Sequence, residues 1–233
     1  MVTKLTLGSK MKLSNNSRRI YTKIVPLCIR QGLESVLLPS YPKEYDDRQY
    51  IFIHIPKTAG KSIISKLHNR GATHLCYSDY EELLGEKLKS YFIFTVIRDP
   101  ADRFASAFSY LKAGGNQSKE DKAFAKQWIR NKDLNDFIET SFQHDKVKNS
   151  FFFRSQASFL KNKNGQIAHI KILRLNSLQE DFASISGRLG VSPDLPYLNK
   201  SNSKQNVLSE NAKRIIEQTY QEDYQLFHSS SES

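Results

Sequence analysis

An apolar strand that runs directly into a short basic turn, at residues 50–62, constrains the fold of this chain most. The segment YIFIHIPKTAGKS ends in Gly60-Lys61-Ser62 and contains no acidic residue. In such a turn, successive backbone N–H groups and the start of the following helix can bind a phosphate-like anion, while lysines supply positive charge. The segment therefore predicts a strand, an anion-binding turn and a helix, in that order.

Two further strand candidates follow in the chain. Residues 91–97 are predicted as a second buried strand that ends at Arg98, and residues 168–175 are predicted as a third strand. Unbroken apolar runs are typical of strands that are covered on both faces. After Arg98, Asp99 and Pro100 predict the N-cap and the first residue of a helix.

The helical spacing of apolar residues indicates helices between and after these strands. They are expected from about residue 61 to a stop at Gly71, over 99–111, over 123–143, from a capping box at Ser177–Glu180 to Gly190, and over 209–226, with a loop at 112–122. This alternation predicts the α/β class, in the form of a P-loop-like three-layer fold with a central, mainly parallel sheet flanked by helices. Ligands bind such sheets at the carboxyl ends of the strands, where the basic turn and Arg98 both lie.

The chain of 233 residues is expected to form one large domain at residues 49–228. A basic, partly ordered N-terminal arm at 1–48 precedes it, and a disordered tail at 229–233 follows it. Residues 1–30 contain seven lysines and arginines and no acidic residue, so they carry +7 of the net charge of +11. The arm is typical of a solvated segment, of one that makes peripheral contact with an anionic membrane or polymer, or of an organelle transit peptide; the sequence leaves these readings open.

Several classes of protein fit the sequence poorly. No apolar run approaches the roughly 18–20 residues of a membrane span, and residues 1–30 lack the continuous apolar region of a signal peptide. Cys28 and Cys76 offer neither a disulfide framework nor metal-ligand spacing. We therefore expect a cytoplasmic protein, with peripheral membrane association or organelle targeting as alternatives. Nucleic acid is not an expected partner, because no zinc finger, helix-turn-helix or aromatic-basic sheet pattern is present. The oligomeric state stays open.

The basic turn departs from the loop of nucleotide hydrolases. That loop needs G-x-x-x-x-G-K-[ST], and Gly60-Lys61-Ser62 matches only its end. Ile55 stands where the first glycine should be, and isoleucine resists the positive φ that a curl around a β-phosphate requires. Pro56 follows it, with a fixed φ and no N–H donor. A shorter and tighter turn is therefore expected.

Several segments occur in an order that is known from one family. They are PKTAGKS (56–62), VIRDPADRFAS (96–106), FRSQ (153–156) with FL (159–160), LR (173–174) before DF (181–182), LNKS (198–201), and Tyr220, Asp223, Tyr224 and Phe227. Together they resemble sulfotransferases that use 3′-phosphoadenosine 5′-phosphosulfate (PAPS), in particular the carbohydrate branch with its Golgi and bacterial members. The resemblance covers about residues 50–228. It departs from the family at Lys61, where small or hydroxyl residues are commoner.

The resemblance implies two anion sites for PAPS. The turn would hold the 5′-phosphosulfate through Lys57, Thr58, Ala59, Gly60, Lys61 and Ser62. Lys57 would also act in catalysis, by stabilising the leaving phosphate. Arg98, with its fork of donors, and Ser106, two helical turns after Asp99, would bind the 3′-phosphate. Lys200 and Ser201 are expected to close over that phosphate.

A sugar hydroxyl needs a general base near neutral pH, and histidine is the usual choice. His74 is the candidate, since it lies between the two PAPS segments, where the resemblance also places a histidine. His54 is expected to be a hydrogen-bonded core residue. His68 and His144 are expected to be surface residues, and His169 and His228 belong to no motif. No cluster has metal-ligand spacing, so no catalytic metal is expected.

The acceptor is expected to be a carbohydrate hydroxyl, on a lipid-linked glycan, a polymer or a small metabolite. By resemblance, Arg154 and Gln156 are candidates for acceptor or cofactor contacts. Two other functions stay open at this point. One is a P-loop kinase or nucleotide hydrolase that uses Lys61 and Ser62 on phosphate and Mg²⁺; the other is a non-catalytic anion- or glycan-binding module on the same fold.

Overall fold

Three parallel strands form the centre of the structure, in the order β1–β2–β3. The computed structural model describes residues 43–67, 74–196 and 207–230. Strands β1 (Tyr50–Ile53), β2 (Phe92–Ile97) and β3 (Lys171–Arg174) pair in parallel, with Ile53 opposite Thr95 and Ile97 opposite Arg174. Their carboxyl ends therefore lie at one edge of the sheet. This confirms the prediction of an α/β fold with a parallel sheet flanked by helices.

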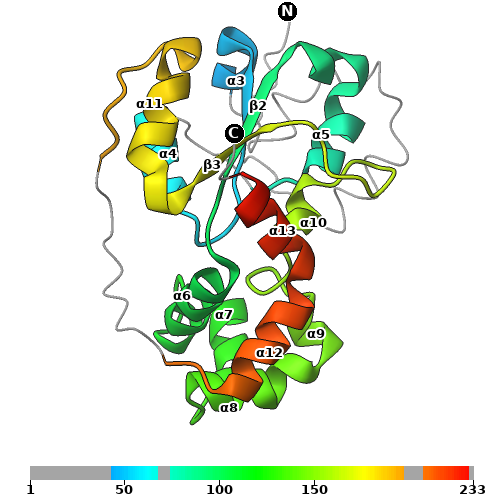
Figure 1. Ribbon diagram of the computed structural model, residues 1–233, viewed down its shortest axis with the longest axis vertical. Helices are drawn as coiled ribbons and strands as arrows, with labels where there is room; N and C mark the ends of the chain where they lie inside the picture. Colours follow the sequence, from blue (N-terminus) through cyan, green and yellow to red (C-terminus); the bar gives the residue numbers. More distant parts are fainter. Residues whose placement is uncertain (1–42, 68–73, 197–206, 231–233) are drawn as a thin grey trace, which may run out of the picture.

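The helices group into two halves of the molecule (Figure 1). Helices α3 (Lys43–Arg48), α4 (Gly60–Lys66), α5 (Tyr77–Leu84) and α11 (Leu178–Leu189) surround the sheet. The other half contains α6 (Pro100–Lys112), α7 (Lys119–Phe124), α8 (Leu134–Glu139), α9 (Asp145–Lys148) and α12 (Glu210–Thr219), while α10 (Ala157–Leu160) and α13 (Gln221–Ser229) lie where the halves meet. Short 3₁₀ segments occupy Gly85–Ser90, Ser141–Gln143 and Leu175–Ser177, and a π-helical segment occupies Ala125–Ile129.

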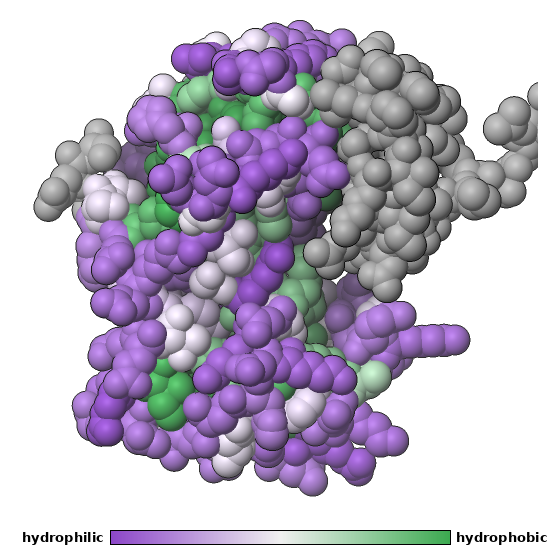
Figure 2. All heavy atoms as spheres, turned by 90° about the vertical axis from the view of Figure 1, so that its right-hand side faces the viewer, coloured by the Kyte–Doolittle hydropathy of each residue, from purple (hydrophilic) through white to green (hydrophobic). Residues whose placement is uncertain are grey.

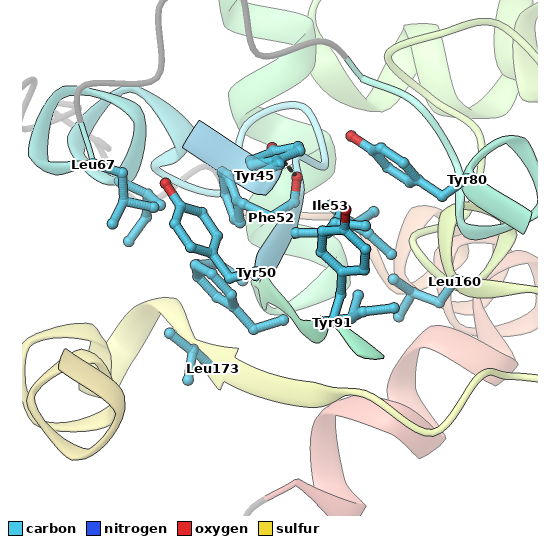
Figure 3. Close-up of a cluster of buried hydrophobic side chains, with 14 of the residues drawn as sticks. Tyr45, Tyr50, Phe52, Ile53, Leu67, Tyr80, Tyr91, Leu160 and Leu173 are labelled. Atoms are coloured by element: carbon cyan, nitrogen blue, oxygen red, sulfur yellow. Dashed lines mark hydrogen bonds between the residues drawn. The ribbon is translucent and has the colours of Figure 1, made fainter. Parts of the chain in front are cut away.

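Each half has its own hydrophobic core. Figure 3 shows part of the core around the sheet, where the Tyr45 hydroxyl of α3 donates a 3.0 Å hydrogen bond to the Phe52 carbonyl of β1. Tyr45 is fully buried, so the ordered core begins within the last residues of the predicted arm. The second core gathers around Phe104 and Phe153 and is completed by Tyr220 from the end of the chain. Figure 2 shows that hydrophilic side chains dominate the visible face, with smaller hydrophobic areas between them.

Helix α6 joins the two halves. The Asp99 carboxylate accepts a hydrogen bond from the Asp102 amide at 3.0 Å, and Pro100 occupies the first turn, which confirms the predicted start of this helix. The helix leaves the carboxyl end of β2 and enters the helical half, so it carries its first turns past the strand ends.

Several predicted boundaries were wrong. The loop at 112–122 is interrupted by α7, which Ser118 caps, and the single helix at 123–143 is divided at 130–133, where Asn131 has φ 64° and Asp133 caps α8. The last helix is broken at Tyr220, and α13 continues to Ser229, inside the predicted tail. Ser177 makes no capping hydrogen bond, so the capping box at Ser177–Glu180 is absent, although α11 does end at a left-handed Gly190. Helix α5 was not predicted at all. The predicted stop at Gly71 lies outside the described residues.

Candidate active site

The basic turn holds two non-glycine residues in a left-handed conformation. Lys57 has φ 71° and Ala59 has φ 62°, a region that side chains rarely adopt. The Thr58 hydroxyl stabilises the turn by donating to the Ile55 carbonyl at 2.9 Å, and the Ser62 amide donates to the Ala59 carbonyl at 3.0 Å. Among the described residues, the N–H groups from Lys57 to Lys61 have no acceptor in the protein. The turn therefore presents unpaired amides, as an anion-binding turn does.

Three cations gather at this turn. Burial of the Lys57 ammonium, together with the positive charges of Lys61 and Arg98, lowers the pKa of Lys57 below its ordinary value of 10.5. Its Nζ lies 4.1 Å from the centre of the Tyr110 ring, whose electron-rich face attracts the ammonium. Lys61 is exposed, whereas Lys57 and Arg98 are half-buried. Such mutual repulsion is relieved by a bound anion, so the residues present fit a phosphosulfate group.

Arg98 directly follows the last residue of β2, and two carboxylates lie near its guanidinium. Burial lowers the pKa of its guanidinium, while the nearby carboxylates of Asp102 and Asp99 raise it. Ser106 is half-buried on α6, four residues after Asp102, so it lies on the helix face that Asp102 shares. Arg98 directly precedes the N-cap of α6, and Ser106 lies in the middle of that helix.

His74 is anchored on the end of β1. Its Nδ1 lies 2.7 Å from the carbonyl oxygen of His54, and the two imidazole rings are 3.9 Å apart. Burial lowers the pKa of His74, the hydrogen bond to His54 raises it, and the charge of Arg154 lowers it again. Because a carbonyl can only accept, Nδ1 carries the proton and Nε2 of the neutral ring keeps its lone pair. The geometry gives His74 the protonation state of a general base.

His54 differs from the prediction. Its Nδ1 is buried without a hydrogen-bond partner among the described residues, so it is not a hydrogen-bonded core histidine. Burial, with a contribution from His74, lowers the pKa of His54 to about 3. Its Nε2 lies against the turn, since a Cβ placed on Gly60 would meet it at 1.8 Å. His54 therefore packs between the turn and His74.

A family model described as the sulfotransferase family matches residues 45–229. This chain belongs to the sulfotransferase family. Family membership makes it an enzyme and implies PAPS as co-substrate. A search of curated proteins and a search of solved structures each returned no match.

In this sulfotransferase, Arg103 is a site residue that the sequence interpretation missed. It is only 2 % exposed, and its guanidinium donates to the carbonyls of Pro56 (3.1 Å), Phe152 (3.2 Å) and Arg154 (3.0 Å). It therefore ties the basic turn to the segment at 152–154. The sequence contained a signal for this position. Arg103, Ala107 and Leu111 are spaced four residues apart, so they lie on one face of α6, and that face is buried.

Arg154 and Gln156, the two candidates for acceptor contacts, both use their side chains for contacts within the protein. Arg154 donates from Nη2 to the Cys76 sulfur at 3.0 Å, and its guanidinium lies 3.7 Å from the centre of the Phe159 ring. The Gln156 side chain is bonded on both sides to the Arg98 backbone. Neither arrangement leaves the side chain directed at an acceptor, so the structure gives both residues a supporting position.

The other sequence candidates are placed as follows. Lys200, Ser201 and His68 lie outside the described residues. His144 is exposed, as the sequence predicted, and His169 and His228 are exposed as well. In the described part of the chain, no three His, Cys, Asp or Glu side chains gather as a metal ion requires, and no helix is long and apolar enough to cross a membrane.

Proposed function

We propose that this sulfotransferase transfers the sulfuryl group of PAPS to a hydroxyl group of a carbohydrate, with His74 as general base. The observation that carries the proposal is the arrangement at the end of β1. The turn that follows β1 presents unpaired amides beside three cations, and the Nδ1 of His74 is anchored on the carbonyl of His54, directly after the same strand. An in-line displacement needs this combination of an anion cradle and a base.

The basic turn, together with Arg98 and Ser106, provides the binding site for the donor PAPS. The Lys57 ammonium and the unpaired turn amides at 57–61 bind the phosphosulfate, and Arg98 with Ser106 binds the 3′-phosphate. As the bond between sulfur and the bridging oxygen breaks, its electron pair passes to that oxygen, and the Lys57 ammonium stabilises the charge that develops there. Arg103 supports this step, because it holds the Pro56 carbonyl and so keeps the turn in place.

His74 activates the attacking hydroxyl group of the acceptor. The hydroxyl oxygen forms the new bond to sulfur, and its proton passes to Nε2 of His74. The His54 carbonyl holds the other ring nitrogen, so the imidazole accepts the proton without changing its orientation. The imidazolium then releases the proton to solvent.

An aromatic surface between base and cradle supports a carbohydrate acceptor. Phe151 is 41 % exposed and meets the His74 ring edge-on, with centroids 4.8 Å apart. Phe152 contacts Phe151, and Tyr110 contacts Phe152 and lies under the Lys57 ammonium. The row Phe151–Phe152–Tyr110 therefore leads from the base to the leaving-group cation. The apolar C–H face of a sugar ring packs against exposed aromatic rings of this kind.

The test is a transfer assay with a radiolabelled sulfuryl group on PAPS and a panel of oligosaccharides, glycolipids, phenols and simple alcohols. The proposal predicts label on a carbohydrate. His74→Ala should lose about a hundredfold or more in kcat and still bind adenosine 3′,5′-bisphosphate, whereas His144→Ala, at an exposed histidine, should keep full turnover. Label found only on phenols or alcohols would refute the acceptor class, and full turnover by His74→Ala would refute the base.

A further inference from the structure

We propose that Gln156 is a positioning residue for the 3′-phosphate of PAPS, because its side-chain amide fixes the backbone of Arg98. The inference rests on the proposed role of Arg98 in binding that phosphate. Gln156 would not touch the ligand. It would act by holding the one residue whose guanidinium does.

The side-chain amide of Gln156 bonds both the backbone N–H and the backbone carbonyl of Arg98. The Arg98 amide donates to Oε1 of Gln156 at 3.0 Å, and Nε2 of Gln156 donates to the Arg98 carbonyl at 2.8 Å. The side chain is 1 % exposed, so water does not compete for these bonds. Since β2 ends at Ile97, the Gln156 amide takes the place of a peptide group from a neighbouring strand and extends the ordered pairing by one residue.

Gln156 is held in turn by the C-terminal helix. The carboxylate of Asp223, on α13, accepts from the backbone amides of Gln156 at 2.7 Å and Ala157 at 2.9 Å. Asp223 is 1 % exposed, and both of its oxygens are used in these two bonds. A buried carboxylate bound by two amides is a rigid anchor, so the position of Gln156 is fixed before any ligand binds.

A second anchor from the same end of the chain provides a matched control. The Tyr220 hydroxyl donates to the Phe153 carbonyl, three residues before Gln156. It stabilises the same segment, but it makes no contact with Arg98. Loss of this bond should reduce stability without changing how Arg98 is held.

The experiment measures the dissociation constants of adenosine 3′,5′-bisphosphate and of adenosine 5′-monophosphate by calorimetry. Their ratio gives the preference for a 3′-phosphate. In Gln156→Met, which removes both hydrogen bonds, the preference should fall about tenfold, through weaker binding of the bisphosphate alone. Gln156→Glu keeps the length and the acceptor, but it sets a carboxylate oxygen against the Arg98 carbonyl, so the preference should fall at least as far as in Gln156→Met. Tyr220→Phe should keep the preference of the unmodified protein.

The outcomes separate this inference from the proposed function. If the unmodified protein shows no preference for the bisphosphate, the 3′-phosphate site itself is wrong and the inference falls with it. If the preference exists and Arg98→Ala abolishes it, but both Gln156 variants retain it in full, the positioning role alone is refuted. Equal weakening of both ligands would also refute it, since that is the result of a general structural role. If Gln156→Met does not fold, the ratio in Gln156→Glu decides.

Discussion

His74 donates its Nδ1 proton to the carbonyl oxygen of His54 over 2.7 Å. The bond connects the candidate base to the residue that directly follows β1, four residues before Thr58 of the turn. It therefore fixes both the tautomer of His74 and its position relative to the anion cradle. The two rings, tilted by 31° with centroids 3.9 Å apart, are in direct contact, so the two histidines pack as one unit.

The pH profile of the reaction should reflect the protonation of His74. Burial and the charge of Arg154 lower the pKa of His74 below its ordinary value of 6.5, although the hydrogen bond to His54 raises it. The base is active when neutral, so kcat/KM should be constant from about pH 8 to pH 6.5 and fall only at lower pH, about tenfold per unit. In Arg154→Gln the lowering charge is gone, so the acid limb should move to higher pH; Arg130→Gln, at an exposed arginine, should not move it. A limb that begins above pH 6.5 would contradict this account.

Gly60 should tolerate no side chain while His54 is present. An alanine Cβ at this position would lie 1.8 Å from Nε2 of His54, so the imidazole would have to leave its place. Gly60→Ala should lower the free energy of unfolding by about 1–3 kcal/mol, measured by urea denaturation, and should reduce turnover. The double variant Gly60→Ala/His54→Ala should recover part of that stability, because the clash is removed. The matched control is Gly187→Ala in α11, where nothing lies within 4 Å; it should be neutral or gain about 0.5–1 kcal/mol. Additive effects of the two substitutions in the double variant would argue against the clash.

Arg103 should be essential for stability. Arg103→Leu leaves three carbonyl oxygens without their donor, at Pro56, Phe152 and Arg154. The free energy of unfolding should fall by about 3 kcal/mol, and the bisphosphate should bind more weakly because the turn loses its anchor. Arg130→Leu, at an exposed site, should change stability by no more than about 0.5 kcal/mol. Equal stability of the two variants would show that the buried guanidinium does not hold the turn.

Phe151 should determine how well the acceptor binds. In Phe151→Ala the KM for the acceptor should rise about tenfold, because the exposed ring beside His74 is lost, while the affinity for the bisphosphate stays unchanged. Phe151→Tyr keeps the ring and should behave like the unmodified protein. The control is Val207→Ala, at the other large hydrophobic residue exposed in the described part of the chain, with 84 % exposure. An unchanged acceptor KM in Phe151→Ala would exclude stacking on this ring.

The sequence predicted the parts of the fold that local patterns encode. Unbroken apolar runs located β1 and β2, and Asp99-Pro100 located the start of α6, because each signal lies within a few residues of the structure it specifies. The breaks at 130–133 and at Tyr220 were missed. At Tyr220 the apolar spacing continues across the break, and what interrupts the helix is the docking of this ring into the second core.

The site residues that could be predicted are those at or near the carboxyl ends of the strands. Lys57, Arg98 and His74 were chosen from strand ends and resemblance; the structure brings them together, and their roles stay predictions. The supporting contacts could not be predicted, because they join residues far apart in the chain. Gln156 meets Arg98 across 58 positions, and Asp223 meets the Gln156 amide across 67. Only the three-dimensional fold reveals such pairs.

The most direct test of the central claim is the thermal unfolding of the protein with adenosine 3′,5′-bisphosphate and, separately, with ATP and Mg²⁺. At a hundred times its dissociation constant, the bisphosphate should add about 2.7 kcal/mol of stability, a rise of about 5–10 °C in Tm. Lys57→Ala and Arg98→Ala should each reduce that rise. Stabilisation by Mg²⁺-ATP without any by the bisphosphate would contradict a PAPS site at this turn.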